Sequence, residues 1–231
     1  MGVQLVKPPV TYLGLPLTAV RISIRDCYPL VERITKRILS WKNKFLSYAG
    51  RLELVKSLLQ AFHVYWARTF VLPTTVLEQV SKICIRFLWF GPMMEKKVHH
   101  ASRKVLMKAK HEGGLNVMDL ELWNKAAYCG LVFKIVSKDS SLWVTWTWAH
   151  HLNNKHFWTM TIPTDCSWVW RNILQMRETT KKFIQYSLVD GKNTSLWYDP
   201  WCKGEVLCDN LEARAKFQLL QEAKVSTLIE N

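Results

Sequence analysis

Residues 26–45 read DCYPLVERITKRILSWKNKF, and this stretch predicts the kind of fold that the whole chain adopts. Large apolar residues recur in it at every third or fourth position, which is the spacing of one face of an α-helix. These apolar residues are Leu30, Ile34, Ile38, Trp41 and Phe45. The basic residues that fall on or beside the opposite face are Arg33, Lys36, Arg37 and Lys44. The stretch therefore predicts a helix with one apolar and one basic side, with Asp26 as its N-cap and Pro29 in its first turn.

Two more helices are predicted downstream of this one. Ser47 is expected to cap the second helix, in which apolar residues again recur at every third or fourth position until Pro73 ends it. Those positions are Leu52, Val55, Leu59, Phe62, Trp66 and Phe70. Thr75 followed by Glu78 has the spacing of a capping box, which predicts the start of a third helix. Three amphipathic helices with short connections predict a compact bundle over residues 21–91.

Shorter signals describe the segments on either side of the bundle. Residues 10–15, VTYLGL, predict a short strand or hairpin arm. Residues 93–111 are expected to be basic and irregular, with one strand near 105–107, and a turn is expected at 112–114. Residues 187–198 hold two short apolar runs around the turn residues DGKN and predict a β-hairpin. The starts of three later helices are predicted at Asp119, at Ser140 or Ser141, and at Ser167.

The charge of the chain lies almost entirely in its first half. The 231 residues carry 32 Lys and Arg against 18 Asp and Glu, a net charge of +14. Residues 1–115 hold 19 basic and 6 acidic residues, a net +13, whereas residues 116–231 hold 13 and 12, a net +1. Such asymmetry indicates a polyanionic partner for the first half, either nucleic acid or an anionic membrane surface. A charged surface that only keeps the protein in solution is the alternative.

Motifs of enzymatic and metal-binding chemistry are absent from the sequence. It contains no GxSxG, no HExxH, no phosphate-binding Gly-rich loop, and no two adjacent Asp residues of the kind that hold metal ions in a polymerase. The His and Cys residues lack the spacings of zinc ligands, so neither a metal site nor a cofactor is expected. The sequence by itself thus predicts a helical nucleic-acid-binding protein without an active site.

Cysteine usage and hydropathy bear on the compartment. Six cysteines occur without a CxxC motif, and we expect them to be buried or free thiols. No apolar run of about 18 residues is present, and the first ten residues have no apolar core like that of a signal peptide. We therefore expect an intracellular protein, nuclear or cytoplasmic, that is not secreted and has no membrane partner.

Five short motifs, taken in order, resemble a known family. They are YLGLPL at residues 12–17, LSWKNKFLSYAGRL at 39–52, FLW at 87–89, EGGL at 112–115 and SLWYDPW at 195–201. Together they resemble the reverse transcriptases of plant LINE-type (non-LTR) retrotransposons, and the likeness extends from about residue 10 to about residue 226. The resemblance and the periodicity together imply a mainly α-helical fold: a three-helix thumb-like bundle, then a helical, Trp-rich connector with a small β-hairpin.

The resemblance also implies a division of labour along the chain. Residues 1–20 would be the end of the palm, with a primer-grip-like segment at Tyr12, Leu13 and Gly14. Residues 21–91 would be the thumb-like basic bundle, and residues 92–231 a connector that precedes a zinc-binding region. The bundle would bind the backbone of RNA or of an RNA–DNA duplex without reading sequence. The expected binding residues are Arg33, Lys36, Arg37, Lys42, Lys44, Arg51 and Lys56.

The metal-binding carboxylates of the family would lie before Tyr12, and its zinc-binding region after Asn231. A fragment of an RNA-directed DNA polymerase without catalytic activity is therefore expected. Two alternatives stay open. The Trp-rich half would dock another polypeptide, such as another reverse-transcriptase segment, or the product would be an orphan whose helices lack the palm on which they pack.

Overall fold

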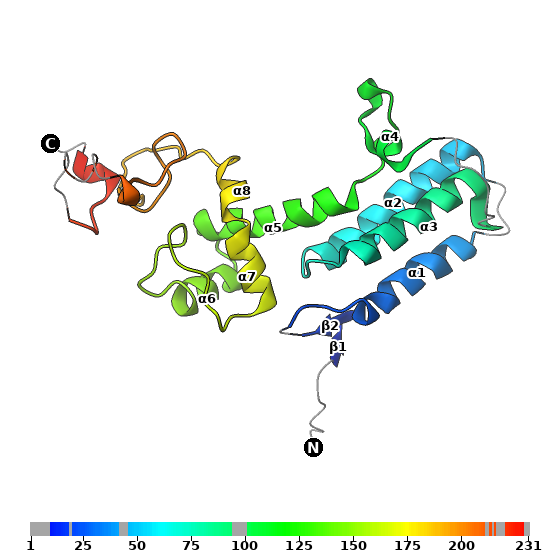
Figure 1. Ribbon diagram of the computed structural model, residues 1–231, viewed down its shortest axis with the longest axis horizontal. Helices are drawn as coiled ribbons and strands as arrows, with labels where there is room; N and C mark the ends of the chain where they lie inside the picture. The colour runs from blue at the N-terminus through cyan, green and yellow to red at the C-terminus, as the bar shows by residue number, and fades with distance from the viewer. Residues whose placement is uncertain are drawn as a thin grey trace, which may run out of the picture. The chain divides into compact units, whose positions relative to one another are not determined.

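The computed structural model describes residues 10–18, 20–41, 46–93, 101–210, 213, 215 and 220–228, without the side chains of residues 59–63, 93 and 209. Within these residues the chain is mainly α-helical and has one small two-stranded antiparallel sheet (Figure 1). The fold class predicted from the sequence is confirmed. The elements in chain order are β1 (Val10–Tyr12), β2 (Leu15–Leu17), η1 (Arg25–Cys27), α1 (Tyr28–Leu39), α2 (Tyr48–Ala67), α3 (Thr74–Phe90), η2 (Gly91–Met93), α4 (Arg103–Met107), η3 (Lys110–Glu112), α5 (Leu120–Val136), α6 (Leu142–His150), α7 (Trp168–Gln175), α8 (Arg177–Lys181), η4 (Leu207–Asp209) and η5 (Val225–Leu228).

The chain forms two compact units. Unit 1 comprises Met1–Tyr128 with Ser167–Val169, and unit 2 comprises Cys129–Cys166 with Trp170–Asn231. None of the described helices combines the length and the apolar composition that a membrane crossing requires.

The bundle of unit 1 consists of α1, α2 and α3, each of which contacts the other two (Figure 1). The apolar side of α1 packs in the core as predicted, because Leu30, Ile34 and Ile38 are at most 2% exposed. Trp41 follows at 6% exposure, and its ring lies 5.2 Å from the ring of Phe87 on α3, measured between centroids. Burial of each such side chain stabilises the fold by about 1.5–3 kcal/mol. The fifth predicted position, residue 45, lies outside the described residues.

Within the three-helix bundle, two local signals at the helix starts are confirmed and two are wrong. Ser47 caps α2, since its Oγ accepts a hydrogen bond of 3.2 Å from the backbone N–H of Gly50. Pro29 lies in the first turn of α1. Asp26, the predicted cap of α1, instead lies inside η1 and accepts hydrogen bonds from the backbone and the hydroxyl of Ser23. A preceding hydroxyl thus satisfies this carboxylate before α1 begins.

The predicted capping box at the start of α3 is also wrong. Pro73 is the N-cap residue, and no side chain accepts a hydrogen bond at this end. Its backbone is extended, with φ −59° and ψ 138°, so α3 begins at Thr74, before the predicted cap Thr75. Glu78 points to a different partner and pairs with Lys82 at 3.4 Å, one turn further along α3.

The β-hairpin lies at the start of the described chain and not at residues 187–198. Strand β1 pairs with β2 in antiparallel register, with Val10 opposite Leu17 and Tyr12 opposite Leu15. The hairpin predicted at 187–198 is wrong, because Ser195 forms an isolated antiparallel bridge with Lys224 and not with residues 187–189.

The backbone groups of the hairpin predicted at residues 187–198 form hydrogen bonds with the segment 223–226 instead. The carbonyl of Thr194 accepts from Val225 N–H at 3.1 Å, and that of Gly191 accepts from Ser226 N–H at 3.3 Å. A Cβ at Gly191 would lie 2.6 Å from Ser226 N, so this close approach requires glycine. Non-local pairing therefore replaces the local hairpin.

The strand predicted near residues 105–107 is wrong, because Arg103–Met107 is the short helix α4. Three apolar residues in a row do not distinguish a strand from a buried helical turn. Leu106 is 2% exposed, and its carbonyl accepts from the N–H groups of Leu115 and Val117. The intervening turn at 112–114 is confirmed: Gly113 has φ 80°, and a Cβ at Gly114 would lie 2.0 Å from the carbonyl oxygen of Lys108.

A buried amide joins the α2–α3 connection to α5. Asp119 caps α5 as predicted, and its Oδ1 accepts from Glu121 N–H at 3.0 Å. On the first turns of α5, Asn124 is only 4% exposed. Its Oδ1 accepts from Leu72 N–H at 2.8 Å, and its Nδ2 donates to the carbonyls of Phe70 at 2.8 Å and Ala67 at 3.3 Å. These bonds satisfy backbone groups that the end of α2 leaves open.

Unit 2 is organised by short helices and by one arginine. Ser141 is the N-cap residue of α6, as predicted. The predicted start at Ser167 also corresponds to a helix, since α7 begins at Trp168. The half-buried guanidinium of Arg177 donates to three backbone carbonyls at 2.6–2.9 Å. These carbonyls belong to Phe157, Met160 and Leu174, so one side chain ties α7 and α8 to the preceding loop.

Candidate nucleic-acid interface

Five of the seven basic residues predicted to bind nucleic acid lie on α1 and α2 in unit 1: Arg33, Lys36, Arg37, Arg51 and Lys56. The other two, Lys42 and Lys44, lie outside the described residues. The local surroundings of the five differ, and they decide which of them is available to a ligand.

The turn between β1 and β2 contains the predicted primer-grip-like residues. Tyr12 pairs with Leu15, so Leu13 and Gly14 alone form the turn, and both have positive φ, 49° and 81°. Positive φ at both central residues matches the twist of a two-residue hairpin. A leucine in the left-handed region costs about 1–2 kcal/mol, so surrounding contacts must hold it there. One such contact comes from Tyr65 on α2, whose hydroxyl donates to the carbonyl of Leu13 at 2.8 Å.

Arg33 of α1 lies against this turn. A Cβ built on Gly14 would be 3.3 Å from Nη2 and 3.5 Å from Nη1 of Arg33. Glycine at this position therefore serves two purposes: it allows φ 81°, and it lets the guanidinium approach the backbone of the turn. The structure thus brings together a predicted primer-grip-like residue and a predicted phosphate-binding residue that are 19 positions apart in the sequence.

The residues Tyr12, Leu13, Gly14, Arg33 and Tyr65 are called the turn cluster below. Tyr12 is 61% exposed, Leu13 74% and Tyr65 41%. Arg33 is also exposed and has no ion-pair partner within the described ranges. The cluster therefore combines one cation that has no ion-pair partner among the described residues with two accessible tyrosine side chains. A guanidinium of this kind can bind a phosphate with two hydrogen bonds, and a tyrosine can pack on a sugar or a base.

Arg37 and Lys36 continue the basic side of α1. Arg37 lies one turn beyond Arg33, and its guanidinium carbon is 5.8 Å from the centroid of the Trp41 ring. The attraction between the cation and the ring stabilises this position of the Arg37 side chain. Lys36 instead pairs with Glu32 at 2.7 Å, and both side chains are well exposed. The neighbouring carboxylate reduces what Lys36 adds to the local positive potential.

Arg51 and Lys56 are not brought to the turn cluster. Arg51 is half-buried at the start of α2, where a Cβ on Gly91 would be 3.6 Å from its Nη1. Tyr65, which contacts the turn, lies 14 residues further along the same helix, a rise of about 21 Å. Lys56 pairs with Glu53 at 3.4 Å, and its side chain is 22% exposed. Arg51 is therefore separated from the turn cluster, and the charge of Lys56 is shared with a carboxylate.

Tyr65 is the member of the turn cluster that the sequence analysis missed. It lies next to Trp66 of the apolar side of α2 but is itself exposed. An aromatic residue beside the apolar stripe of an amphipathic helix, without a packing role, is the signal that would have indicated it.

The cysteines supply no reactive centre in this unit. All six are free, and burial raises the pKa of Cys27 and that of Cys84 to about 12, so both thiols stay protonated at neutral pH. Over the described part of the chain, no group of three or more His, Cys, Asp and Glu residues is arranged to hold a metal ion.

The fold and the site define a class: a basic helical bundle with a hairpin turn fastened to it, followed by a Trp-rich helical unit. The chain is 28% identical, over 199 residues, to a "Putative ribonuclease H protein" of Arabidopsis thaliana. That match covers 84% of this chain but only 32% of the relative. An "Uncharacterized mitochondrial protein" of the same plant is 24% identical over 146 residues, which are 63% of this chain and 95% of the relative. No protein-family profile matches the chain, and no solved structure matches it.

Proposed function

We propose that this chain is a retrotransposon-related fragment, corresponding to the thumb and connector of a reverse transcriptase, and that it binds nucleic acid through the turn cluster and α1. The observation that carries the proposal is the contact between Arg33 and Gly14. It joins the primer-grip-like motif to the basic side of the bundle, as a surface that holds a primer strand requires. The net charge of +13 in residues 1–115 gives this unit the field that attracts a polyanion.

The likeness to the two plant proteins supports the first part of the proposal, that the chain is retrotransposon-related. The first relative carries the name "Putative ribonuclease H protein", and its likeness to this chain covers 84% of the chain. The matched stretch is about a third of that relative. The activity of the whole relative is therefore not assigned to these 231 residues.

Binding on this surface would follow the phosphate backbone. Arg33 and Arg37 lie one turn apart on α1, a rise of about 6 Å, so each can contact a different phosphate of one strand. Contacts to phosphates orient a protein on a duplex without reading its bases. We therefore assign non-specific binding of RNA or an RNA–DNA duplex to the bundle.

We assign no nucleotide incorporation to these residues. Metal-dependent polymerisation uses closely placed carboxylates, and the sequence contains no adjacent Asp pair. Primer extension by the purified chain with magnesium and all four deoxynucleotides checks this part of the proposal. Extension that persists after removal of contaminating polymerases would contradict it.

Fluorescence anisotropy of a labelled blunt RNA–DNA duplex tests the binding. The double substitution Arg33→Ala and Arg37→Ala should weaken binding at least tenfold at low salt, because two charge-assisted contacts are lost. Arg86→Ala is the matched control, since Arg86 is an exposed arginine on α3. Equal affinity of the double variant and the wild type would contradict the proposal.

One observation favours a second function, the docking of another polypeptide on unit 2. On α6, Leu142 is 90% exposed, Trp146 49% and Trp143 37%. Apolar side chains that gather on one short helix are typical of protein contacts. Separate expression of residues 1–128 and of the full chain distinguishes the two functions, because the first requires duplex binding to persist in residues 1–128.

A further inference from the structure

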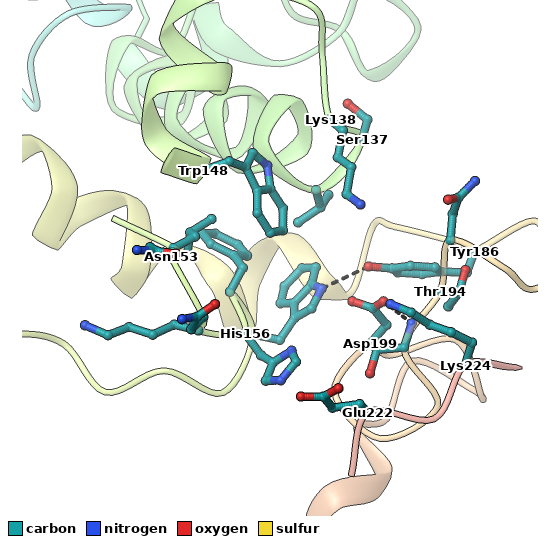
Figure 2. A pocket seen from close by; sticks show the side chains of 18 residues that line it. Ser137, Lys138, Trp148, Asn153, His156, Tyr186, Thr194, Asp199, Glu222 and Lys224 are labelled. Atoms are coloured by element: carbon teal, nitrogen blue, oxygen red, sulfur yellow. Dashed lines mark hydrogen bonds between the residues drawn. The ribbon is translucent and has the colours of Figure 1, made fainter. Parts of the chain in front are cut away.

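Unit 2 contains a partly open cavity of about 940 Å³ that the proposed function does not use. It is lined by residues 136–138 at the end of α5, the loop 152–158, Trp148, Tyr186, residues 193–195 and Asp199, together with residues 222 and 224 (Figure 2). Cavities that bind small ligands have volumes of about 300–1,000 Å³. The cavity is therefore large enough for a small organic molecule.

Flat rings with fixed orientation form the wall of this cavity. Trp148 donates its Nε1–H to the carbonyl of Ile135 at 3.0 Å, and Trp158 donates to the hydroxyl of Tyr186 at 2.9 Å. His156 stacks on Tyr198 with 3.6 Å between ring centroids and 8° between ring planes. With their polar atoms engaged, both indole rings are held in place. Trp158 is only 6% exposed, whereas the half-buried Trp148 is accessible to a planar ligand.

A half-buried carboxylate lines the cavity, as Figure 2 shows for Asp199 beside Tyr186. Asp199 Oδ2 accepts from Ser195 N–H at 2.7 Å. An ionised carboxylate has about four acceptor positions, so some of them are left for the N–H groups of a ligand. Burial raises the pKa of Asp199, although Lys224 and Lys138 oppose this shift.

Cations lie at the rim of the cavity. Lys138, Lys155 and Lys224 are exposed and line it, against the two carboxylates of Asp199 and Glu222. The ammonium of Lys138 is 5.3 Å from the centroid of the Trp148 ring, so one cation lies directly beside the aromatic wall. This arrangement suits a ligand with a flat polar ring at one end and an anionic group at the other.

We infer that the cavity binds one unpaired nucleotide, with its base between the aromatic side chains, a base N–H group on Asp199 and its phosphate at Lys138 and Lys224. Stacking on aromatic side chains together with hydrogen bonds to the base edge is how proteins bind splayed-out bases of single strands. A base in a duplex is stacked on both faces and paired along one edge, which excludes it from such a cavity. The inference rests on the proposed function for the source of the nucleotide, which is an RNA strand or the free mononucleotide.

Anisotropy with two probes tests the inference and keeps it separate from the proposed function. The full-length chain is titrated with a labelled single-stranded RNA hexamer and with the blunt RNA–DNA duplex. The double substitution Lys138→Gln and Lys224→Gln should weaken hexamer binding about fivefold or more and leave duplex binding unchanged. His156→Ala, which removes one stacking ring, should weaken hexamer binding about fivefold or more as well. The control replaces Lys134 and Lys192, two exposed lysines of unit 2 that do not line the cavity, with glutamine.

Photocrosslinking gives a readout that misfolding of a variant does not imitate. A hexamer with 4-thiouridine should crosslink to peptides that contain residues 152–158 or 195–201 of the wild-type chain. Crosslinks confined to residues outside 136–224, or unchanged hexamer affinity in the lysine and His156 variants, would overturn the inference even if the duplex binds. Competition by AMP at hexamer-like concentrations assigns the site to the free nucleotide, whereas hexamer binding without such competition assigns it to the strand. Failure of the wild-type chain to bind the duplex would instead contradict the proposed function.

Discussion

Replacement of Gly14 by alanine tests the contact between the hairpin turn and Arg33. The turn has φ 81° at Gly14, and a Cβ there would lie 3.3 Å from Nη2 of Arg33. Because alanine is strained in this left-handed conformation, Gly14→Ala should lower the free energy of unfolding by about 1–2 kcal/mol. The guanidinium is the far end of a flexible side chain and can move by a few tenths of an ångström. We therefore expect Arg33 to shift away from the turn. Duplex affinity should then fall about threefold to tenfold, because part of the free energy of one charged contact is lost.

The binding effect should depend on Arg33 and the stability effect should not. In a double-mutant cycle, Gly14→Ala should no longer weaken duplex binding once Arg33 is alanine, while urea unfolding still shows the loss of stability. Gly113→Ala is the matched control, because Gly113 also has positive φ, 80°, but no atom within 4 Å of the added Cβ. It should lower stability by a similar amount without any effect on binding. Additive losses of affinity for Gly14→Ala and Arg33→Ala would refute the reasoning.

Two further predictions concern the interiors of the two units. Asn124→Ala removes three hydrogen bonds and leaves the N–H of Leu72 without its partner. The free energy of unfolding should therefore fall by about 2–4 kcal/mol. The neighbouring substitution Lys125→Ala is the control and should change the free energy of unfolding by less than about 0.5 kcal/mol. Urea unfolding followed by circular dichroism measures both, and a loss below about 1 kcal/mol for Asn124→Ala would be inconsistent with a role for the amide. Because burial raises the pKa of Asp199 in the folded state, that state holds the proton more tightly than the unfolded chain, whose Asp pKa is about 4. The free energy of unfolding of the wild type, relative to that of Asp199→Asn, should therefore decline as the pH rises from about 4 through the raised pKa and be constant above it. If this difference in free energy does not vary between pH 4 and 7.5, the carboxylate is not desolvated in the folded state.

Local periodicity was sufficient to predict the bundle. The apolar side of α1 and the cap at Ser47 depend on residues within one or two helical turns, and both are found in the structure. Predictions from short segments were less successful, because distant backbone groups decided the outcome. Ser195 pairs with Lys224, Leu196 N–H donates to the carbonyl of Ala223, and the carbonyl of Leu106 accepts from Leu115 and Val117.

The candidate site was predictable as a list of basic residues but not as an arrangement. Spacing alone does not reveal that Arg33 approaches Gly14 or that Arg51 is half-buried beside Gly91, since both contacts join elements that are far apart in the sequence. The hydrogen bonds of Asn124 and the aromatic cavity of unit 2 are non-local for the same reason. A polar residue such as Asn124 on an otherwise apolar face of a helix would have been a signal for such a network.

The salt dependence of duplex binding tests the central claim most directly. If about four basic residues, Arg33 and Arg37 among them, each neutralise one phosphate, the logarithm of the binding constant should fall with the logarithm of salt concentration with a slope of about −3.6. The variant with Arg33→Ala and Arg37→Ala should have a slope of about −1.8, and Arg86→Ala should keep the wild-type slope. Binding that does not vary with salt, or a slope that is the same in all three proteins, would contradict a phosphate-binding surface on α1.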